Sequence, residues 1–126
     1  SEYARIDNRA FSILKRYLPG PYTFILPAAT TLPKVFKGRK TVGVRIPDND
    51  ITRCLAETLG HPMLSTSVTG EAASMGEPEE IALAYSEVAA VMVDGGTCAG
   101  QMSTVVDLTD SSSPEIVRQG AGEFEA

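Results

Sequence analysis

The chain has 126 residues, of which 43% are hydrophobic and 21% charged, and its formal net charge is −5. These values are ordinary for one globular domain that is long enough to bury a core. The acidic balance excludes a protein that is basic over its whole surface, as many nucleic-acid-binding domains are. No stretch approaches the roughly 18 apolar residues of a membrane-spanning helix, and no signal peptide is visible.

Cysteine and histidine are scarce, which limits the chemistry further. Cys54 and Cys98 are too few for a disulfide framework, and this favours a reducing compartment such as the cytoplasm. His61 has no partner at the spacing of a zinc site or of a Ser-His-Asp triad. We therefore expect no bound metal.

Helix and strand signals alternate along the first half, and strands predominate later. A helix is expected over Asn8–Leu18, with Asp7 as its N-cap and Phe11 on its apolar stripe. Pro19-Gly20-Pro21 ends this helix. Strands are expected over Tyr22–Leu26, Thr41–Ile46, Pro62–Ser67, Val88–Val93, Ser103–Leu108 and Glu115–Arg118. The pattern predicts an α/β (mixed α+β) fold, with helices packed on a twisted mixed sheet.

Two further helices and the tail complete the expected elements. Asp50 is placed as the N-cap of a second helix that ends at Gly60, and Pro78 begins a short third one. The run Val88–Val93 is nearly all apolar, which is typical of a strand covered on both faces. The tail Gly120–Ala126 is expected to be loose.

Hydroxyl and arginine side chains stand on five of these strands or at their ends. They are Thr23, Arg45, Ser65, Ser67, Ser103 and Arg118. Such groups suit a site for a phosphate-bearing small molecule, because they donate hydrogen bonds to oxyanions. The alternatives are ordinary strand-end hydroxyls and surface arginines, and Arg45 could instead pair with Asp48 as a structural ion pair.

A basic stretch precedes the second strand, formed by Lys34, Lys37, Arg39 and Lys40. It is either a solvated loop or a patch that meets phosphates or RNA.

Five short motifs, in this order, resemble those of the YrdC/YciO family. They are Pro19-Gly20-Pro21-Tyr22-Thr23, Val44-Arg45-Ile46-Pro47, Ser65-Thr66-Ser67, Ser103-Thr104-Val105-Val106-Asp107 and Arg118-Gln119-Gly120. The resemblance covers nearly all of the chain and is closer to the YciO branch. It implies a YrdC-like three-layer fold, with residues 1–126 as the C-terminal portion of a single domain that is incomplete at its N-terminus.

The resemblance also implies an activity. Characterised family members make threonylcarbamoyl-adenylate and pyrophosphate from threonine, bicarbonate and ATP, with Mg²⁺, for the tRNA modification N6-threonylcarbamoyladenosine. By resemblance, Thr23, Ser65, Ser67 and Arg118 correspond to nucleotide-binding residues. Ser103 corresponds to a residue at the threonine substrate, and Arg45 could bind the substrate carboxylate. No residue is implied as a covalent catalyst, since such a reaction depends on positioning and charge neutralisation.

The chain departs from the family at Val68-Thr69-Gly70, where the synthases have an Ala-Asn pair and then Ser-Gly. Nothing in it matches the family's N-terminal lysine-and-arginine motif, which grips ATP. This part alone is therefore expected to be inactive. Two alternatives stay open: a diverged YciO-type acyl-adenylate hydrolase, and a non-catalytic double-stranded RNA-binding module.

Overall fold

The structure is a computed structural model, and it describes residues 3–29, 38–65, 78–95 and 102–125. The chain divides into two compact units, which we describe separately. Unit 1 comprises Ser1–Arg53 with Ser103–Ala126, and unit 2 comprises Cys54–Met102. No helix in the described ranges is long and apolar enough to cross a membrane.

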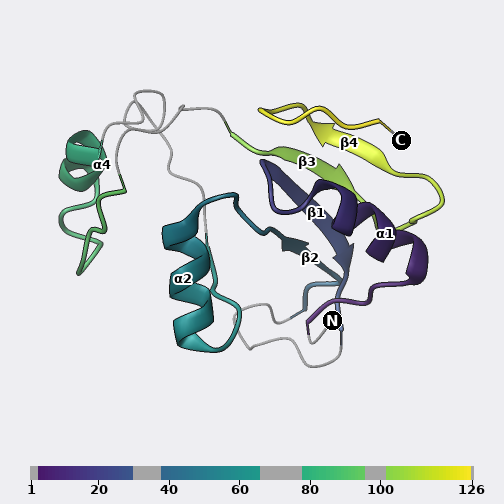
Figure 1. The fold of residues 1–126 in the computed structure, drawn as a ribbon, viewed down its shortest axis with the longest axis horizontal. Helices are drawn as coiled ribbons and strands as arrows, with labels where there is room; N and C mark the ends of the chain where they lie inside the picture. Colours follow the sequence, from purple (N-terminus) through teal and green to yellow (C-terminus); the bar gives the residue numbers. More distant parts are fainter. Residues whose placement is uncertain (1–2, 30–37, 66–77, 96–101, 126) are drawn as a thin grey trace. The chain divides into compact units, whose positions relative to one another are not determined.

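Seven helices and strands are described (Figure 1). In chain order they are α1 (Asn8–Tyr17), β1 (Tyr22–Pro27), β2 (Thr41–Val44), α2 (Asp50–Leu59), α4 (Pro78–Ala84), β3 (Thr104–Asp107) and β4 (Glu115–Arg118). The four strands form one mixed sheet in the order β2-β1-β3-β4. β1 is antiparallel to β2 and parallel to β3, and β3 is antiparallel to β4. The predicted mixed α/β class is confirmed.

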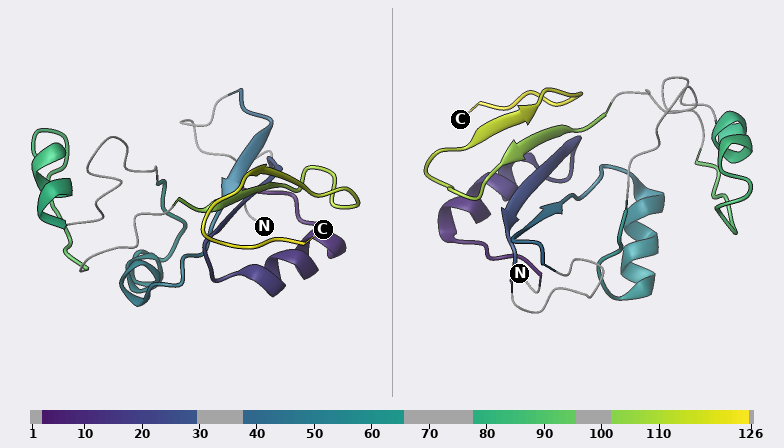
Figure 2. Two further views of the ribbon diagram at one scale, coloured as in Figure 1. Left: turned by 90° about the horizontal axis from the view of Figure 1, so that it is seen from above. Right: turned by 180° about the vertical axis from the view of Figure 1, so that it is seen from behind.

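Unit 1 contains the core, which lies between α1 and one face of the sheet (Figure 2). Strand side chains alternate between the two faces, so Phe24, Leu26 and Val106 all point to the α1 side and are buried. Ala10 and Leu14 of α1 meet them. The opposite face of the sheet carries the intervening residues of the strands, and this face holds the site described below.

The helix α1 begins as predicted, but the side chains that it packs against the sheet differ in part from those predicted. The Asp7 carboxylate accepts a hydrogen bond from the Ala10 amide at 2.8 Å, which confirms the N-cap. Phe11 is 58% exposed, so its assignment to the buried stripe was wrong. Ala10 and Leu14 are buried instead, because the stripe that faces the sheet is rotated by one residue.

The C-terminal segment is docked, not loose, up to residue 125. Phe124 is buried, and its ring centroid lies 4.8 Å from that of Tyr17 on α1. The Tyr22 hydroxyl donates to the carbonyl of Glu123. Gly122 passes so close to Tyr22 that a Cβ atom there would lie 2.5 Å from Cζ of the ring. The tail thus completes the core with a large aromatic side chain.

Two predicted strands of the middle region are not formed in the described residues. Residues 62–65 have no strand pairing, and Ser67 lies outside the described residues. Val88–Val93 is neither a strand nor buried, since its side chains are exposed. An apolar run becomes a strand only where a neighbouring strand supplies hydrogen-bond partners, and no described residue pairs with this one.

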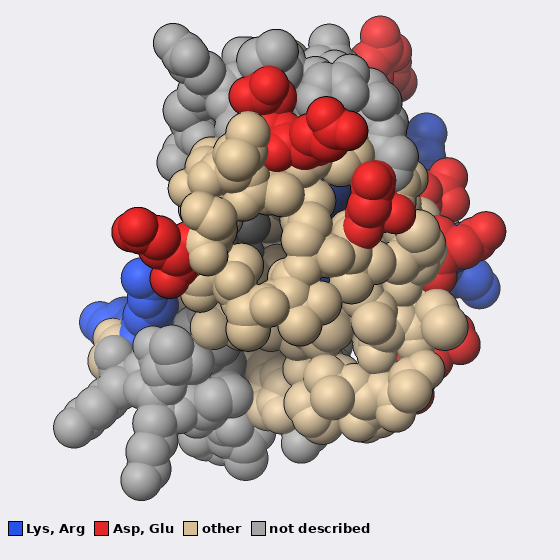
Figure 3. Space-filling view, turned by 90° about the vertical axis from the view of Figure 1, so that its left-hand side faces the viewer, with Lys and Arg blue, Asp and Glu red and all other residues tan. Residues whose placement is uncertain are grey.

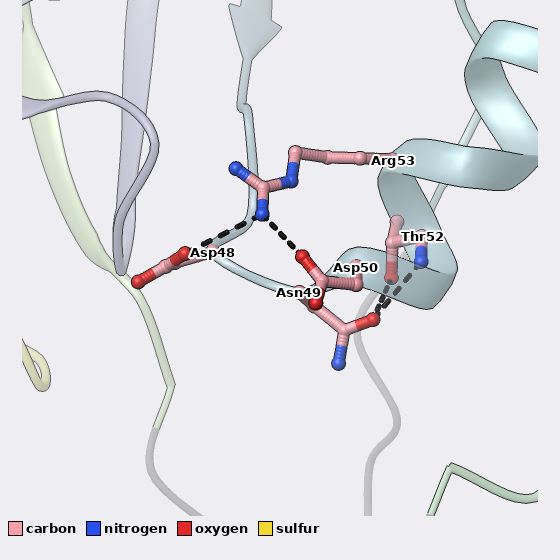
Figure 4. Close-up of polar contacts among 5 residues, drawn as sticks. All are labelled: Asp48, Asn49, Asp50, Thr52 and Arg53. Atoms are coloured by element: carbon pink, nitrogen blue, oxygen red, sulfur yellow. Dashed lines mark hydrogen bonds and ion pairs between the residues drawn. The ribbon is translucent and has the colours of Figure 1, made fainter.

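The helix α2 ends at Gly60, which has a φ of +82°, and this confirms the predicted C-terminal stop. Its N-cap, however, is Asn49 and not Asp50 (Figure 4). The Asn49 side chain accepts from the Thr52 amide at 2.9 Å and from the Thr52 hydroxyl at 3.1 Å. Asp50 lies in the first turn, where its carboxylate pairs with Arg53 at 2.6 Å.

Candidate functional site

Three chain segments of unit 1 meet beside the Pro19-Gly20-Pro21 turn. The Gly20 amide donates to the carbonyl of Ile46, which follows β2, at 2.9 Å. The Pro21 carbonyl accepts from the Thr104 amide at the start of β3, also at 2.9 Å. Gly20 is required here, because a Cβ atom would lie 2.7 Å from the carbonyl oxygen of Tyr17. The turn therefore joins the ends of α1, β1, β2 and β3.

Thr23 and Ser103 are brought into direct contact at this junction. Their hydroxyl oxygens lie 2.7 Å apart, although 80 residues separate them in sequence. Thr23 pairs with Val105 in the parallel β1–β3 ladder, so Ser103, two residues earlier, shares the face of Thr23. Ser103 is buried and Thr23 is half-buried.

Arg118 completes the cluster from β4. Its Nη2 donates to the carbonyl of Ser103 at 2.7 Å and to the Ser103 hydroxyl at 3.2 Å, and its Nε reaches the same carbonyl at 3.1 Å. Among the described residues, no hydrogen bond takes the two N–H groups of Nη1. We call Thr23, Ser103 and Arg118 the hydroxyl–arginine cluster.

A β-bulge sets the direction of Arg118. Asp107 pairs with Glu115 and Val106 with Ile116, but Val105 pairs with Arg118 instead of Val117. Because paired residues point to the same face of a sheet, this shift by one residue places Arg118 on the face of Val105. A regular register would turn it to the buried face with Thr104.

The hydrogen-bond direction in the cluster favours an anionic ligand. A guanidinium group only donates, so the Ser103 hydroxyl accepts from Arg118, while either hydroxyl can be the donor between Ser103 and Thr23. In the arrangement in which Ser103 donates to Thr23, the hydroxyl hydrogen of Thr23 can bind a ligand. The positive charge of Arg118 favours this arrangement when the ligand offers a carboxylate or phosphate oxygen.

Thr104 supports the cluster from the buried side, a role that the sequence did not reveal. Its fully buried hydroxyl accepts from the amides of Gly120 and Gly122, at 3.0 and 3.1 Å, and donates to the Gly122 carbonyl. It thereby fastens the segment after Arg118 to the start of β3. The two closely spaced glycines after Arg118 were the available signal, since close backbone approach favours glycine.

Arg45 follows β2 and is exposed, and the described residues give it no ion pair. On β2 itself it is Gly43 that lies beside Thr23: a Cβ atom on Gly43 would be 3.3 Å from Thr23 Cγ2. The alternative partner Asp48 is instead within 3.8 Å of Arg53, beyond the turn (Figure 4). The structural pairing of Arg45 with Asp48 is therefore not formed.

The structure does not test the two serines assigned to the nucleotide. Ser65 is exposed and belongs to unit 2, which is described apart from the cluster, and Ser67 lies outside the described residues. The departure at Val68-Thr69-Gly70 and the basic residues Lys34 and Lys37 also lie outside them. Their roles stay predictions.

The described carboxylates serve local structure. Asp107 accepts from the amide and the hydroxyl of Thr109, at 2.8 and 2.7 Å, which makes it a strand-end cap. The pKa of Asp7 is lowered by the bond from the Ala10 amide and then by that from the Ser111 hydroxyl. In the described ranges, no group of three or more His, Cys, Asp or Glu side chains is placed to hold a metal ion.

Comparison with known proteins places this geometry in a family. The sequence profile of the Sua5/YciO/YrdC family, described as "Telomere recombination", matches residues 1–120. YciO of Escherichia coli K12 is 40% identical over 127 residues, which cover 98% of this chain and 61% of that protein. The threonylcarbamoyl-AMP synthase of Pyrococcus abyssi is 31% identical over 118 residues, 91% of this chain and 34% of that protein.

Solved structures agree with the sequence matches. The crystal structure of E. coli YciO has a TM-score of 0.86 at 39% identity and covers 96% of this chain and 60% of that one. P. abyssi Sua5 complexed with L-threonine has a TM-score of 0.78 at 32% identity, covering 95% of this chain and 36% of that one. The chain thus spans 61% of the length of E. coli YciO. With the profile and both folds in agreement, this chain belongs to the Sua5/YciO/YrdC family.

Proposed function

We propose that this chain is the threonine- and nucleotide-binding part of a threonylcarbamoyl-AMP synthase-like protein. The reaction joins threonine, bicarbonate and ATP to give threonylcarbamoyl-adenylate and pyrophosphate, and it serves tRNA modification. The observation that carries the proposal is the hydroxyl–arginine cluster, in which Arg118 polarises Ser103 and Thr23 toward an oxyanion. A Sua5 structure with L-threonine bound supports it, since that protein shares the fold at 32% identity.

The cluster would act by positioning. When Ser103 donates to Thr23, the hydroxyl hydrogen of Thr23 and the Nη1 hydrogens of Arg118 can together hold a carboxylate or an α-phosphate oxygen in a fixed place. Holding the reactants in line, with charge neutralised on the phosphate, is what an adenylating reaction requires of its side chains. Mg²⁺ would enter with ATP as part of the substrate. Ser65, Ser67 and Arg45 remain proposed ligand contacts.

The YciO-type alternative has a specific observation in its favour, which is an identity of 40% to E. coli YciO against 31% to the P. abyssi threonylcarbamoyl-AMP synthase. A diverged enzyme of this kind would bind an acyl-adenylate and hydrolyse it. It would use the same oxyanion-binding cluster, so the cluster alone does not separate the two activities.

Calorimetric titration with L-threonine and with Mg–ATP, each alone, tests the binding proposal on this chain. We expect both to bind, and we expect Ser103→Ala and Arg118→Lys to weaken binding of at least one of them about tenfold, since each removes a charge-assisted bond. Ser12→Ala is the matched control, because this exposed serine bonds only within α1. Absence of binding by either ligand would overturn the proposal.

Activity then separates the two enzymes. We expect the full-length protein to release pyrophosphate from ATP only when threonine and bicarbonate are both present. Hydrolysis of threonylcarbamoyl-adenylate to AMP, without pyrophosphate release from ATP, would instead establish the YciO-type alternative.

A further inference from the structure

The segment 120–125, which follows β4, is joined to the rest of unit 1 through side chains. It forms no strand, and its backbone bonds no other backbone group in the described part of the chain. Its hydrogen bonds to other elements come from one side chain each of α1, β1 and β3, namely Tyr17, Tyr22 and Thr104. A segment held in this way can leave as a unit, because no strand ladder has to break.

Tyr22 and Thr104 hold this segment from neighbouring strands. They are paired in the parallel β1–β3 ladder, so their side chains point to the same face of the sheet, which is the buried one. The Thr104 hydroxyl accepts from the amides of Gly120 and Gly122, at 3.0 and 3.1 Å. The Tyr22 hydroxyl donates to the carbonyl of Glu123. The two side chains therefore hold the segment at successive points along its backbone.

The sequence neighbour of each of these two residues belongs to the hydroxyl–arginine cluster. Thr23 follows Tyr22 and Ser103 precedes Thr104, and adjacent residues of extended chain point to opposite faces. The residue pairs 22–23 and 103–104 thus carry a cluster residue on one face and a residue that holds the segment on the other.

Arg118 is fixed from both faces of the sheet. Its guanidinium donates to the Ser103 carbonyl at 2.7 Å, while the amide of Gly120, two residues later, donates to the Thr104 hydroxyl at 3.0 Å. When the segment leaves, the backbone after Arg118 loses this anchor. The guanidinium then loses the fixed position from which it meets Ser103, and an unfixed group binds a ligand less well.

We propose that residues 120–125 are a latch, whose docking holds Arg118 in its ligand-binding position. Tyr22 and Thr104 are then positioning residues, because they act on the ligand only through the segment and Arg118. The inference rests on the proposed function, since the ligand is the threonine carboxylate or the nucleotide phosphate bound by the hydroxyl–arginine cluster. A ligand that contacts Arg118 binds the docked form more tightly, and it therefore favours docking in return.

Charge directs such a ligand to unit 1, where the latch and the cluster both lie. Unit 2 contains seven Asp and Glu but no Lys or Arg. The described part of the face shown in Figure 3 is largely uncharged, with acidic and few basic side chains at its margin. Unit 2 is therefore not expected to attract the anion.

Tyr22→Phe loosens the latch without changing a residue of the cluster. It keeps the aromatic ring and removes only the hydrogen bond to Glu123. We expect amide hydrogen exchange at Gly120 and Gly122, followed by NMR, to become about fivefold faster, the loss typical of one neutral hydrogen bond. Exchange at the amide of Leu18, which closes the last turn of α1, should not change.

Tyr3→Phe is the matched control, because the Tyr3 hydroxyl has no hydrogen-bond partner among the described residues. L-threonine and Mg–ATP are then added separately to Tyr22→Phe, each at about a hundred times its Kd from calorimetry. We expect at least one of them to slow exchange at Gly120 and Gly122 about a hundredfold, because the ligand binds the docked form and not the open one.

The outcomes separate the latch from the proposed function. If calorimetry shows binding but neither ligand slows exchange at Gly120 and Gly122, the latch is excluded and the proposed function stands. If Tyr22→Phe speeds exchange at Leu18 as much as at the two glycines, or speeds neither, the segment does not open by itself and the latch is excluded as well. If neither ligand binds the parent, the proposed function fails and the latch fails with it.

Discussion

Arg118 lies opposite Val105, although the register of the neighbouring pairs would place Val117 there. One extra residue in β4 therefore decides which face of the sheet receives the guanidinium group. On the observed face it contacts the Ser103 carbonyl and hydroxyl. On the other face it would enter the apolar core beside Thr104, where an unpaired charge is costly. The bulge makes the hydroxyl–arginine cluster possible.

Inserting one alanine between Val117 and Arg118 should move Arg118 opposite Thr104, on the buried face, and so remove the cluster. We expect this insertion to weaken threonine or nucleotide binding at least about tenfold, a loss typical of a charge-assisted hydrogen bond. Deleting Val117 should instead remove the bulge and leave Arg118 opposite Val105, so this variant is expected to bind as the parent does. Calorimetric titration of both variants makes the comparison, and unchanged binding by the insertion would contradict the role of the register.

Replacing Thr104 by valine should loosen the C-terminal segment. Valine has the same shape but leaves the amides of Gly120 and Gly122 without their buried acceptor. It also removes one of the two donors to the Gly122 carbonyl, the other being the Gln119 side chain. We expect a loss of about 1–3 kcal/mol in the free energy of unfolding, measured in urea. Thr104→Ser keeps the hydroxyl and should lose much less. Equal losses in the two variants would show that the methyl group, not the hydroxyl, matters.

Gly122→Ala should destabilise the protein through a clash with Tyr22. The added Cβ atom would lie 2.5–2.9 Å from three atoms of the tyrosine ring and hydroxyl. The ring has little freedom to move, because its hydroxyl donates to the Glu123 carbonyl and its centroid lies 5.0 Å from that of the tilted Tyr17 ring. We expect a cost of about 1–3 kcal/mol in thermal or urea unfolding. When Tyr22 is first replaced by leucine, Gly122→Ala should cost less free energy of unfolding than it does in the parent. If the two substitutions instead destabilise the protein additively, the clash with Tyr22 is not the cause.

Asp7 should give the protein a specific acid sensitivity. Its pKa is lowered in the folded state by hydrogen bonds from the Ala10 amide and the Ser111 hydroxyl, so ionisation stabilises the folded form. That stabilisation is complete above the ordinary pKa near 3.8 and is lost as the pH falls through the lowered folded value. Asp7→Asn keeps a capping side chain without the charge.

Melting temperatures of the parent and of Asp7→Asn, measured between pH 2 and pH 7, test the direction of this pH dependence. The parent should exceed the variant in stability at neutral pH, and the difference should narrow below about pH 4. In a Ser111→Ala background, the stability difference made by Asp7→Asn should be smaller, because one of the two hydrogen bonds to the Asp7 carboxylate is absent. A difference that grows on acidification would contradict the assignment.

Elements whose signals are local were predictable from the sequence. Asp7 and Gly60 mark helix ends through caps that depend only on adjacent backbone, and both are confirmed. The direct contact of Thr23 with Ser103 was not predicted, since the resemblance assigned Thr23 to the nucleotide and Ser103 to threonine. Its geometry depends on parallel strand pairing across 80 residues, and local patterns contain no information on such a pairing.

The predictions that were wrong depended on tertiary context. Phe11 and Ala10 are equally compatible with a helical stripe, and only the position of the sheet decides that Ala10 is buried. Phe124 lies in a short, glycine-containing tail, yet the aromatic cluster around Tyr17 gives it a buried place. Val88–Val93 has the composition of a covered strand, and the described residues supply no neighbouring strand to cover it.

The parallel pairing of β1 with β3 has a consequence for how the protein is made. The hydroxyl–arginine cluster combines Thr23 with two residues that the ribosome adds 80 or more residues later. Contacts so distant in sequence form slowly, because a long loop must close first. During synthesis, Phe24 therefore lacks Val106, its partner on β3, and the ring of Phe124, whose centroid lies 6.1 Å from its own. The late segment that completes the cluster also completes the packing around Phe24, so formation of the binding site and burial of this aromatic side chain are coupled.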